Sequence, residues 1–233
     1  MRKRLLLISM CACVLALSLS GIASASDRDD DISRINHAAT VFHEIMNTPD
    51  HGIPDGILKK ATCIAIIPGE KKFAFVFGGN YGRGVAVCRR AHGWSAPIFV
   101  AIEGGSVGYQ IGGSSTDLIL VFMNEHALGH LLSDKFKLGG DAAVAAGPVG
   151  RQAAADTDIS LRAEILTYSR AHGIFAGVSL DGSVVKADVS GDHAMYGDNV
   201  TRHDILSGRV TVPVVARPLL HEIHRYMDMI KTS

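Results

Sequence analysis

The chain has 233 residues with 23 Lys and Arg against 23 Asp and Glu, so its formal charge is zero, and 47% of its residues are hydrophobic. This hydrophobic fraction is too high, and the net charge too low, for an intrinsically disordered chain. Neutrality also argues against a nucleic-acid-binding protein, which needs a basic field to attract phosphates. The length suits one domain that can bury its own core.

The first 25 residues have the layout of a secretory signal. A basic start at Arg2–Arg4 is followed by the apolar run Leu5–Leu19 and by the small residues Ala23–Ala25. The run is shorter than the roughly 20 residues of a comfortable membrane span, so cleavage near Ala25 is favoured over an uncleaved anchor. We therefore expect a signal peptide at 1–25, a domain at 26–233, and a periplasmic or secreted protein.

Two of the four cysteines, Cys63 and Cys88, remain after such cleavage. An oxidising compartment permits a disulfide between them. The alternative is a pair of buried thiols that pack as small hydrophobic groups. Sequence gives no distance, so both readings stay open. Cys11 and Cys13 fall within the apolar run, where lipoprotein cleavage would leave a very short apolar core, so lipidation is disfavoured.

An amphipathic helix is predicted at the start of the domain. The acidic run Asp27–Asp31 suits the positive end of a helix dipole. Apolar residues then recur at spacings of three and four, as on one helix face: Ile32, Ile35, Ala39, Phe42 and Met46. Prolines and glycines at 49–54 end this helix, and a short helical turn is expected at Ile57 and Leu58.

Strand signals dominate the next part of the chain. Short apolar runs occupy 62–67, 73–77, 85–88, 98–102, 107–111 and 118–123. Pro68–Gly69 and Gly78–Gly79 are predicted to stop the first two runs. Short strands with glycine-rich turns at this spacing indicate an antiparallel sheet that is strongly curved or closed.

The second half mixes both patterns. A helix is predicted over 125–132, and residues 142–146 are ambiguous. Strands are expected at 165–168, 174–178 and 184–189, with Asp181–Gly182 as a hairpin turn between the last two. A C-terminal helix carries Pro218 in its first turn and one apolar face: Leu219, Leu220, Ile223, Met227 and Ile230. The predicted fold is a single α+β domain, a curved antiparallel β-sheet or barrel-like core with flanking N- and C-terminal helices.

Catalytic motifs are weak. Gly104–Gly108 matches the G-x-S-x-G nucleophile elbow through Ser106, but the residues that follow are poor helix formers, and an elbow needs a helix there. A small serine hydrolase that uses Ser106 is therefore the least favoured function. The glycine-rich stretch Gly78–Gly84 lacks the Lys and Ser or Thr of a phosphate-binding loop.

The histidines give no complete metal motif. His126 and His130 are spaced four residues apart, but the zinc-protease motif needs Glu where Ala127 stands. His221 and His224 form a second helical pair. A metal site needs three or four ligands, so a solvated polar face is favoured for both pairs. The sequence predicts no metal, no cofactor and no enzyme activity.

Many separate motifs agree, in order, with one known family. They are Ala61–Pro68, Lys71–Lys72, Gly78–Gly79, Tyr81–Gly84, Arg89, Gly93–Pro97, Gly104–Gly112, Leu138–Asp141, Gly147–Gly150 and Tyr168–Leu180. Over roughly 35–196 the chain resembles the lipid-binding SYLF domain family, which includes a yeast actin-binding protein, and it looks like a bacterial, exported member. The resemblance implies binding of membrane lipids, phosphoinositides in eukaryotic members and actin in some, with no enzyme activity and no cofactor.

The resemblance also indicates candidate lipid contacts. Lys71 and Lys72 match its basic pair, and Arg83 and Arg89 match basic positions in its glycine-rich region. Each basic group near an anionic membrane surface contributes about 1 kcal/mol, which salt screens. We add Arg90 as a basic neighbour and two aromatic residues for shallow insertion, Tyr81 and Trp94. The alternative is that the charges are ordinary solvated groups and the aromatics pack within the fold.

The predicted function is an exported, non-enzymatic module that binds anionic or phospholipid membrane surfaces at the cell envelope. The acidic start of the first helix opposes this function. It has four aspartates among five residues, and an anionic lipid surface would repel them. The alternative is a periplasmic scaffold whose partner is an envelope protein.

Overall fold

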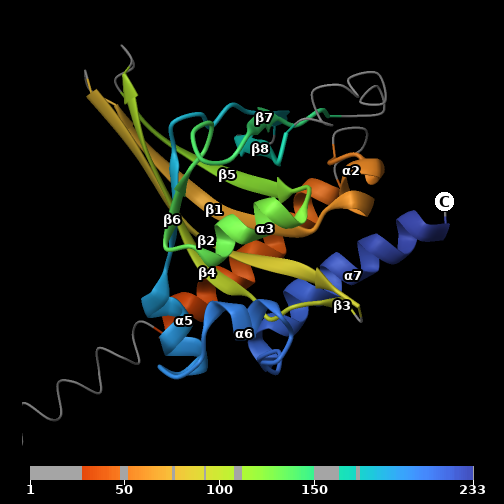
Figure 1. Cartoon of the computed structure of the whole chain (residues 1–233). Helices are drawn as coiled ribbons and strands as arrows, with labels where there is room; N and C mark the ends of the chain where they lie inside the picture. The colour runs from red at the N-terminus through yellow and green to blue at the C-terminus, as the bar shows by residue number, and fades with distance from the viewer. Residues whose placement is uncertain are drawn as a thin grey trace, which may run out of the picture.

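The computed structural model describes residues 28–47, 52–74, 77–91, 93–107, 112–149, 163–171 and 174–232 (Figure 1). The predicted signal peptide at 1–25 lies outside these residues. Within the described ranges, no helix combines the length and the apolar character needed to cross a membrane.

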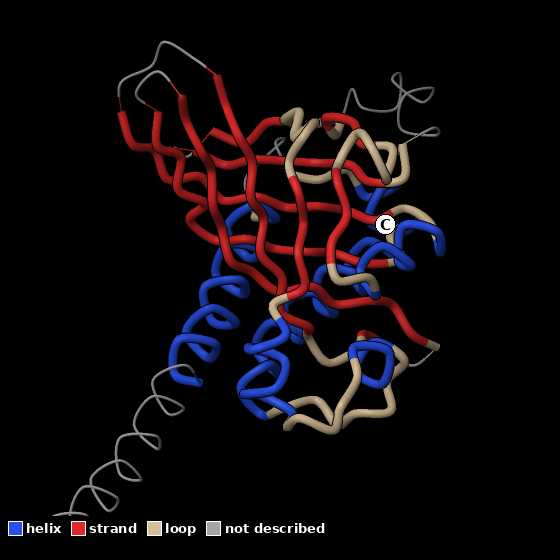
Figure 2. The backbone as a smooth tube through the Cα atoms, turned by 60° about the vertical axis from the view of Figure 1, so that its left-hand side comes forward, coloured by secondary structure: helices blue, strands red, loops and turns tan. Residues whose placement is uncertain are grey.

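One curved, ten-stranded sheet forms the centre of the fold (Figures 1 and 2). Its strands are β1 (Cys63–Ala74), β2 (Phe77–Arg90), β3 (Gly93–Trp94), β4 (Ile98–Val107), β5 (Gly112–Phe122), β6 (Lys135–Lys137), β7 (Val144–Ala146), β8 (Ile165–Ala171), β9 (Ile174–Gly177) and β10 (Val184–Ala187). The order is β6-β10-β4-β2-β1-β5-β8-β7, with β3 on β2 and β9 on β8. Every pair is antiparallel except β7 with β8. The predicted α+β fold with a curved sheet is confirmed.

Helices cover both faces of the sheet. They are a first helix over 28–46, α2 (Asp55–Lys60), α3 (Glu125–Leu132), α5 (Val189–Tyr196), α6 (Arg202–Leu206) and α7 (Arg217–Thr232), with a 3-10 turn η2 (Val214–Ala216) before α7. The first helix and α7 pack their apolar faces on one side of the sheet. The helices α3 and α6 pack on the other side. In Figure 2 the ends of the long strands extend past the helices.

The two terminal helices match the sequence prediction. Ile35 and Phe42 of the first helix are buried, as are Leu219, Ile223 and Met227 of α7. A 3.6-residue apolar period therefore identified both helices and the face that each of them buries.

The prediction that Pro68–Gly69 ends the first strand is wrong, because these residues lie inside β1. The strand pairing shifts register between Ile66 and Lys71, as in a β-bulge. An added Cβ at Gly84 of β2 would lie 2.1 Å from the carbonyl oxygen of Ile66. The bulge and this glycine let the two strands approach closely while they bend, so the chain continues as one long strand.

Three other sequence predictions need correction. Gly78–Gly79 lies within β2 and is not a stop. The Asp181–Gly182 turn does not join a hairpin, because β9 pairs with β8 while β10 pairs with β4 and β6. Val189 begins α5 and does not end a strand. The predicted strand at 107–111 is described only at Val107, the last residue of β4.

Cys63 and Cys88 form a disulfide between directly opposed positions of β1 and β2, with their Cα atoms 4.0 Å apart. Both residues are fully buried. The bridge closes a loop with a sequence separation of 25. In the chain-entropy model a loop of this size stabilises the fold by about 3 kcal/mol.

Gly84→Ala tests the close approach of β1 and β2. We expect a loss of about 1–3 kcal/mol or more in the free energy of unfolding, because a backbone carbonyl cannot turn away from the added methyl group. Denaturant unfolding measures this loss. Gly105→Ala in β4 is the matched control, since its Cβ would meet nothing within 4 Å. Equal stability of the two variants would contradict the argument.

Candidate functional site

Three predicted lipid contacts lie together at the end of β2 and make contacts within the fold. The Arg89 guanidinium carbon lies 4.9 Å from the ring centroid of Trp94, which is buried. Arg89 also donates to the carbonyl oxygens of Leu58 and Ala61, at 2.9 and 3.0 Å, where α2 ends. Burial lowers the pKa of Arg89 and of the half-buried Arg90. The Arg89 side chain therefore connects α2 and Trp94 of β3 to β2.

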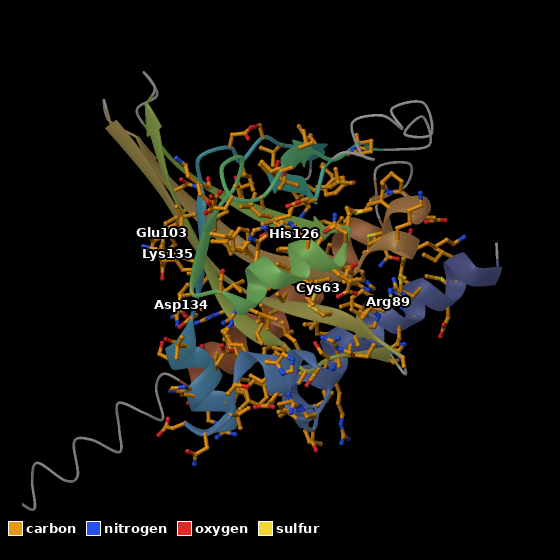
Figure 3. The ribbon with its side chains drawn as sticks, in the orientation of Figure 1. Cys63, Arg89, Glu103, His126, Asp134 and Lys135 are labelled. Carbon is orange, nitrogen blue, oxygen red and sulfur yellow. A yellow bond between two sulfur atoms is a disulfide. The ribbon has the colours of Figure 1, made fainter. Side chains whose placement is uncertain are left out.

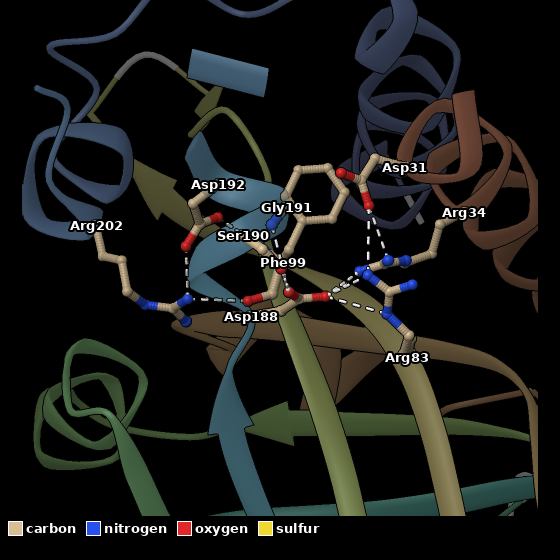
Figure 4. Close-up of polar contacts among 9 residues, drawn as sticks. All are labelled: Asp31, Arg34, Arg83, Phe99, Asp188, Ser190, Gly191, Asp192 and Arg202. Carbon is tan, nitrogen blue, oxygen red and sulfur yellow. Dashed lines mark hydrogen bonds and ion pairs between the residues drawn. The ribbon is translucent and has the colours of Figure 1, made fainter. Parts of the chain in front are cut away.

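Arg83, a fourth predicted contact, has a side chain that is 38% exposed and belongs to a partly buried ionic cluster (Figure 4). Its Nη2 lies 2.9 Å from Oδ2 of Asp188, and Nη1 of Arg34 lies 2.7 Å from the same oxygen. Asp31 completes the cluster, with Oδ1 2.7 Å from Nη2 of Arg34 and 3.8 Å from Nη2 of Arg83. We call Asp31, Arg34, Arg83 and Asp188 the ionic cluster. It joins the first helix, β2 and the residue that follows β10.

Asp188 is the centre of this cluster. It caps the N-terminus of α5, and its Oδ1 accepts hydrogen bonds from Ser190 Oγ at 2.7 Å and from the Gly191 amide at 3.3 Å. Burial opposes its ionisation, but the hydrogen bonds from Ser190, Arg34 and Arg83 outweigh burial and hold the pKa of Asp188 well below its usual range. Asp188 is therefore a carboxylate at neutral pH.

A second buried pair extends the polar contacts toward α6 (Figure 4). Nη1 of Arg202 donates to Oδ2 of Asp192 at 2.7 Å and to the carbonyl oxygen of Phe99 at 2.9 Å. The Phe99 amide donates to Oδ1 of Asp192 at 2.8 Å. Burial raises the pKa of Asp192 to about 6, although Arg202 and the Phe99 amide oppose the shift. This pair joins α5 and α6 to β4.

A groove with a volume of about 560 Å³ opens where β4, β6 and β10 lie side by side. Its charged lining residues are Glu103, Lys135, Lys137, Asp141 and Lys186. We call these five residues and the space between them the lysine groove. Figure 3 shows Glu103 and Lys135 on this side of the molecule and Arg89 on the opposite side.

The alternation of side chains along the strands puts the three groove lysines on one face of the sheet. In β6, Lys135 and Lys137 are exposed while Phe136 between them is buried. Lys186 of β10 is directly opposite Lys135, so their side chains share one face of the sheet. Lys186 forms an ion pair with Glu103. Three cations against two carboxylates leave the groove positive, which suits an anionic ligand.

Two predicted contacts share this sheet face. Lys71 of β1 is opposite Tyr81 of β2, and Tyr81 is opposite Glu103 of β4. Lys71 is exposed, and Tyr81 is 48% exposed. The structure thus brings Lys71 and Tyr81 into one row with the groove, and it places Arg89, Arg90 and Trp94 elsewhere. The side chain of Lys72 lies outside the described residues.

The sequence reasoning missed the three groove lysines. A signal was present in the alternation of Lys135, Phe136 and Lys137, which is typical of a half-buried strand. That pattern does not reveal that Lys186 lies alongside, because β10 pairs with β6 across a long stretch of chain.

Ser106 lies within β4, and its backbone is opposite Gly78 of β2. A nucleophile elbow places its serine on a sharp turn between a strand and a helix. The strand continues through Ser106 to Val107, so the elbow geometry is not met there.

Comparison with known proteins identifies the family to which the chain belongs. A family model described as Ysc84, "Las17-binding protein actin regulator", matches residues 103–226, which include the whole charged lining of the lysine groove. The chain belongs to this family, which is the SYLF family that its motifs indicate. The family description is of a binding protein and regulator.

Individual relatives extend the match. The chain is 40% identical over 175 residues to Protein YSC84 of Saccharomyces cerevisiae, covering 73% of this chain and 37% of that protein. It is 38% identical over 174 residues to LAS seventeen-binding protein 3 of the same species, covering 73% and 38%. It is 30% identical over 208 residues to SH3 domain-containing YSC84-like protein 1 of Mus musculus, covering 86% and 61%. The chain therefore spans less than two thirds of these relatives.

Asp188→Asn tests the ionic cluster. At pH 7 we expect a loss of about 3–5 kcal/mol in unfolding free energy, because Arg34 and Arg83 lose the carboxylate that they share. The pKa of Asp188 is lowered by folding, so its contribution is complete above the unfolded pKa near 4 and falls as the pH drops below it. The difference in unfolding free energy between wild type and Asp188→Asn should therefore decrease below about pH 4.

Urea unfolding at pH 7 and about pH 3 measures both effects. The control is Asp198→Asn, whose side chain is 88% exposed, and which should change stability by less than about 0.5 kcal/mol. If Asp188→Asn unfolds at the same urea concentration as the control at pH 7, the ionic cluster does not stabilise the fold as argued.

Proposed function

We propose that this protein is an exported, non-enzymatic module that binds anionic phospholipid surfaces at the cell envelope. The observation that carries the proposal is the lysine groove, with Lys71 and Tyr81 in line with it on one face of the curved sheet. The SYLF resemblance implies lipid binding, and the groove supplies cationic groups suited to lipid phosphates.

The charges favour Lys135 and Lys137 as the main contacts. Both are exposed, whereas Lys186 is already paired with Glu103. Each lysine close to an anionic surface contributes about 1 kcal/mol, and the contribution decreases within a Debye length. Tyr81 adds an exposed aromatic ring with a polar tip, which suits a membrane–water interface. Arg83 contributes little, because Asp188 and Asp31 surround its charge.

The acidic start of the first helix opposes membrane binding less than the sequence suggests. Asp31 is buried and pairs with Arg34 and Arg83, so its charge is balanced within the fold. Asp29 and Asp30 are exposed.

Vesicle flotation with the double variant Lys135→Ala/Lys137→Ala tests the proposal. Wild type should float with vesicles containing anionic phospholipid at low salt, and less at high salt. Loss of two lysines, at about 1 kcal/mol each, should weaken the binding by about 30-fold. The matched control is Lys59→Ala/Lys60→Ala, which removes two exposed lysines from α2 and should retain wild-type binding.

Two results would count against the proposal. Equal losses in both double variants would show that the groove is not the contact surface. No flotation of wild type with neutral or anionic lipid would end the lipid hypothesis altogether.

The second candidate function is binding of an envelope protein. It is motivated by relatives whose names specify a protein partner, such as LAS seventeen-binding protein 3. Val214 in η2, which is 69% exposed, is an apolar group available to such a partner. Capture of one stoichiometric envelope protein, together with no vesicle binding, would favour this function.

Export has its own test. Protein recovered from the envelope fraction should lack residues 1–25, because the small residues before position 26 suit signal peptidase. Intact-mass measurement detects the cleavage. An unprocessed chain confined to the cytoplasm would contradict export.

A further inference from the structure

Two histidines of α3 lie close to one glutamate that precedes β8, a strand more than 30 residues further along the chain. His126 and His130 are one helical turn apart, and Glu164 immediately precedes β8. One ligand atom from each of the three residues lies within 4.8 Å of the other two. We propose that His126, His130 and Glu164 form a binding site for one divalent transition-metal ion of the zinc type.

The distances suit a metal with small adjustments. Nδ1 of His126 lies 2.8 Å from Oε1 of Glu164, and Nε2 of His130 lies 3.6 Å from Oε2. In a tetrahedral site with bonds of about 2.1 Å, ligand atoms lie about 3.4 Å apart. The two observed distances lie on either side of this value, so side-chain rotation alone can open the space for an ion.

The backbone holds the ligands in position. The amide of Glu164 donates to the carbonyl oxygen of Ala143 at 2.9 Å, and its own carbonyl oxygen accepts from the amide of Met123 at 2.8 Å. The helix α3 is capped by Asn124, whose side chain accepts from the Ala127 amide at 2.8 Å. Both sides of the site are thus fixed before an ion arrives, which lowers the entropy cost of binding.

Two atoms of the trio lack hydrogen bonds. Nε2 of His130 and Oε2 of Glu164 are shielded from solvent, and neither has a hydrogen-bond partner. They face each other at 3.6 Å, which is too long for a hydrogen bond. Buried polar atoms normally have a partner. A cation between them would satisfy both atoms at once.

The ligand set selects the class of metal. Imidazole nitrogens suit zinc, copper, nickel and iron, whereas calcium and magnesium prefer all-oxygen sites. Two histidines and one carboxylate with a fourth position left for water is a known zinc arrangement. The His126 side chain is 71% exposed, so an ion can enter from solvent, while that of His130 is only 17% exposed and packs on Phe136.

The bound ion would connect α3 to the start of β8. It would add to the side-chain contacts that His126 and His130 already make with Glu164, at 2.8 and 3.6 Å. An ion that binds the folded state but not the unfolded chain raises the unfolding temperature. None of its three ligands lines the lysine groove, and the proposal does not rest on the proposed membrane function.

Calorimetric titration of chelator-treated protein with Zn²⁺ tests the site, with thermal unfolding as a second readout. Wild type should bind one ion with micromolar or tighter affinity and unfold at a higher temperature with Zn²⁺, but not with Ca²⁺. His126→Ala and Glu164→Gln should each weaken Zn²⁺ binding by about tenfold or more, since each removes one of three ligands. The metal-free variants should retain the wild-type circular dichroism spectrum.

His221→Ala is the matched control. His221 is 74% exposed, close to the 71% of His126, and it also lies on a helix beside a second histidine. This variant should bind Zn²⁺ as wild type does. The proposal is overturned if wild type binds no Zn²⁺, if Ca²⁺ stabilises equally, or if His126→Ala binds Zn²⁺ as well as His221→Ala. Should Glu164→Gln fail to fold, the exposed His126 position decides the outcome.

Discussion

The carboxylate of Asp188 is held by charges from two other parts of the chain, Arg34 of the first helix and Arg83 of β2. All three side chains are at least partly removed from water, and a buried charge without its partner is strongly unfavourable. The first helix, the central sheet and the β10–α5 junction therefore gain this contact only when they assemble together. Because Asp188 directly follows β10, the cluster also fixes the strand that supplies Lys186 to the lysine groove.

Curvature of the sheet determines what its surface presents. The bulge in β1 and the close approach at Gly84 let long strands bend without interruption. Their ends pass beyond the covering helices (Figure 2). Tyr81 of β2 is exposed and lies opposite Glu103, on the face that also carries the groove. The short edge strand β6 and its neighbour β10 add the lysines. The charged lysine groove and the core thus occupy different stretches of the same sheet face.

Local patterns predicted much of the fold. Apolar periodicity identified the first helix and α7, a helix was also predicted where α3 lies, and short apolar runs located most strands. Prediction failed where a local turn signal competed with long-range pairing. Pro68–Gly69 forms a bulge because β2 and β5 hold β1 on both sides of it. Asp181–Gly182 makes its turn, but the strands beside it find their hydrogen bonds in β8 and β4. Among the predicted contacts whose side chains the structure describes, Lys71 and Tyr81 are the two that lie in one row with the groove.

By itself, the sequence determined the α+β class, the buried faces of the terminal helices and the SYLF membership, because periodicity and motif order are local properties of a chain. Tertiary structure alone decided the strand order, the pairing of Cys63 with Cys88, the lysine groove and the meeting of His126 and His130 with Glu164. Each of these depends on which distant segments exchange backbone hydrogen bonds. That choice is made by the packing of the whole domain, and no short stretch of residues encodes it.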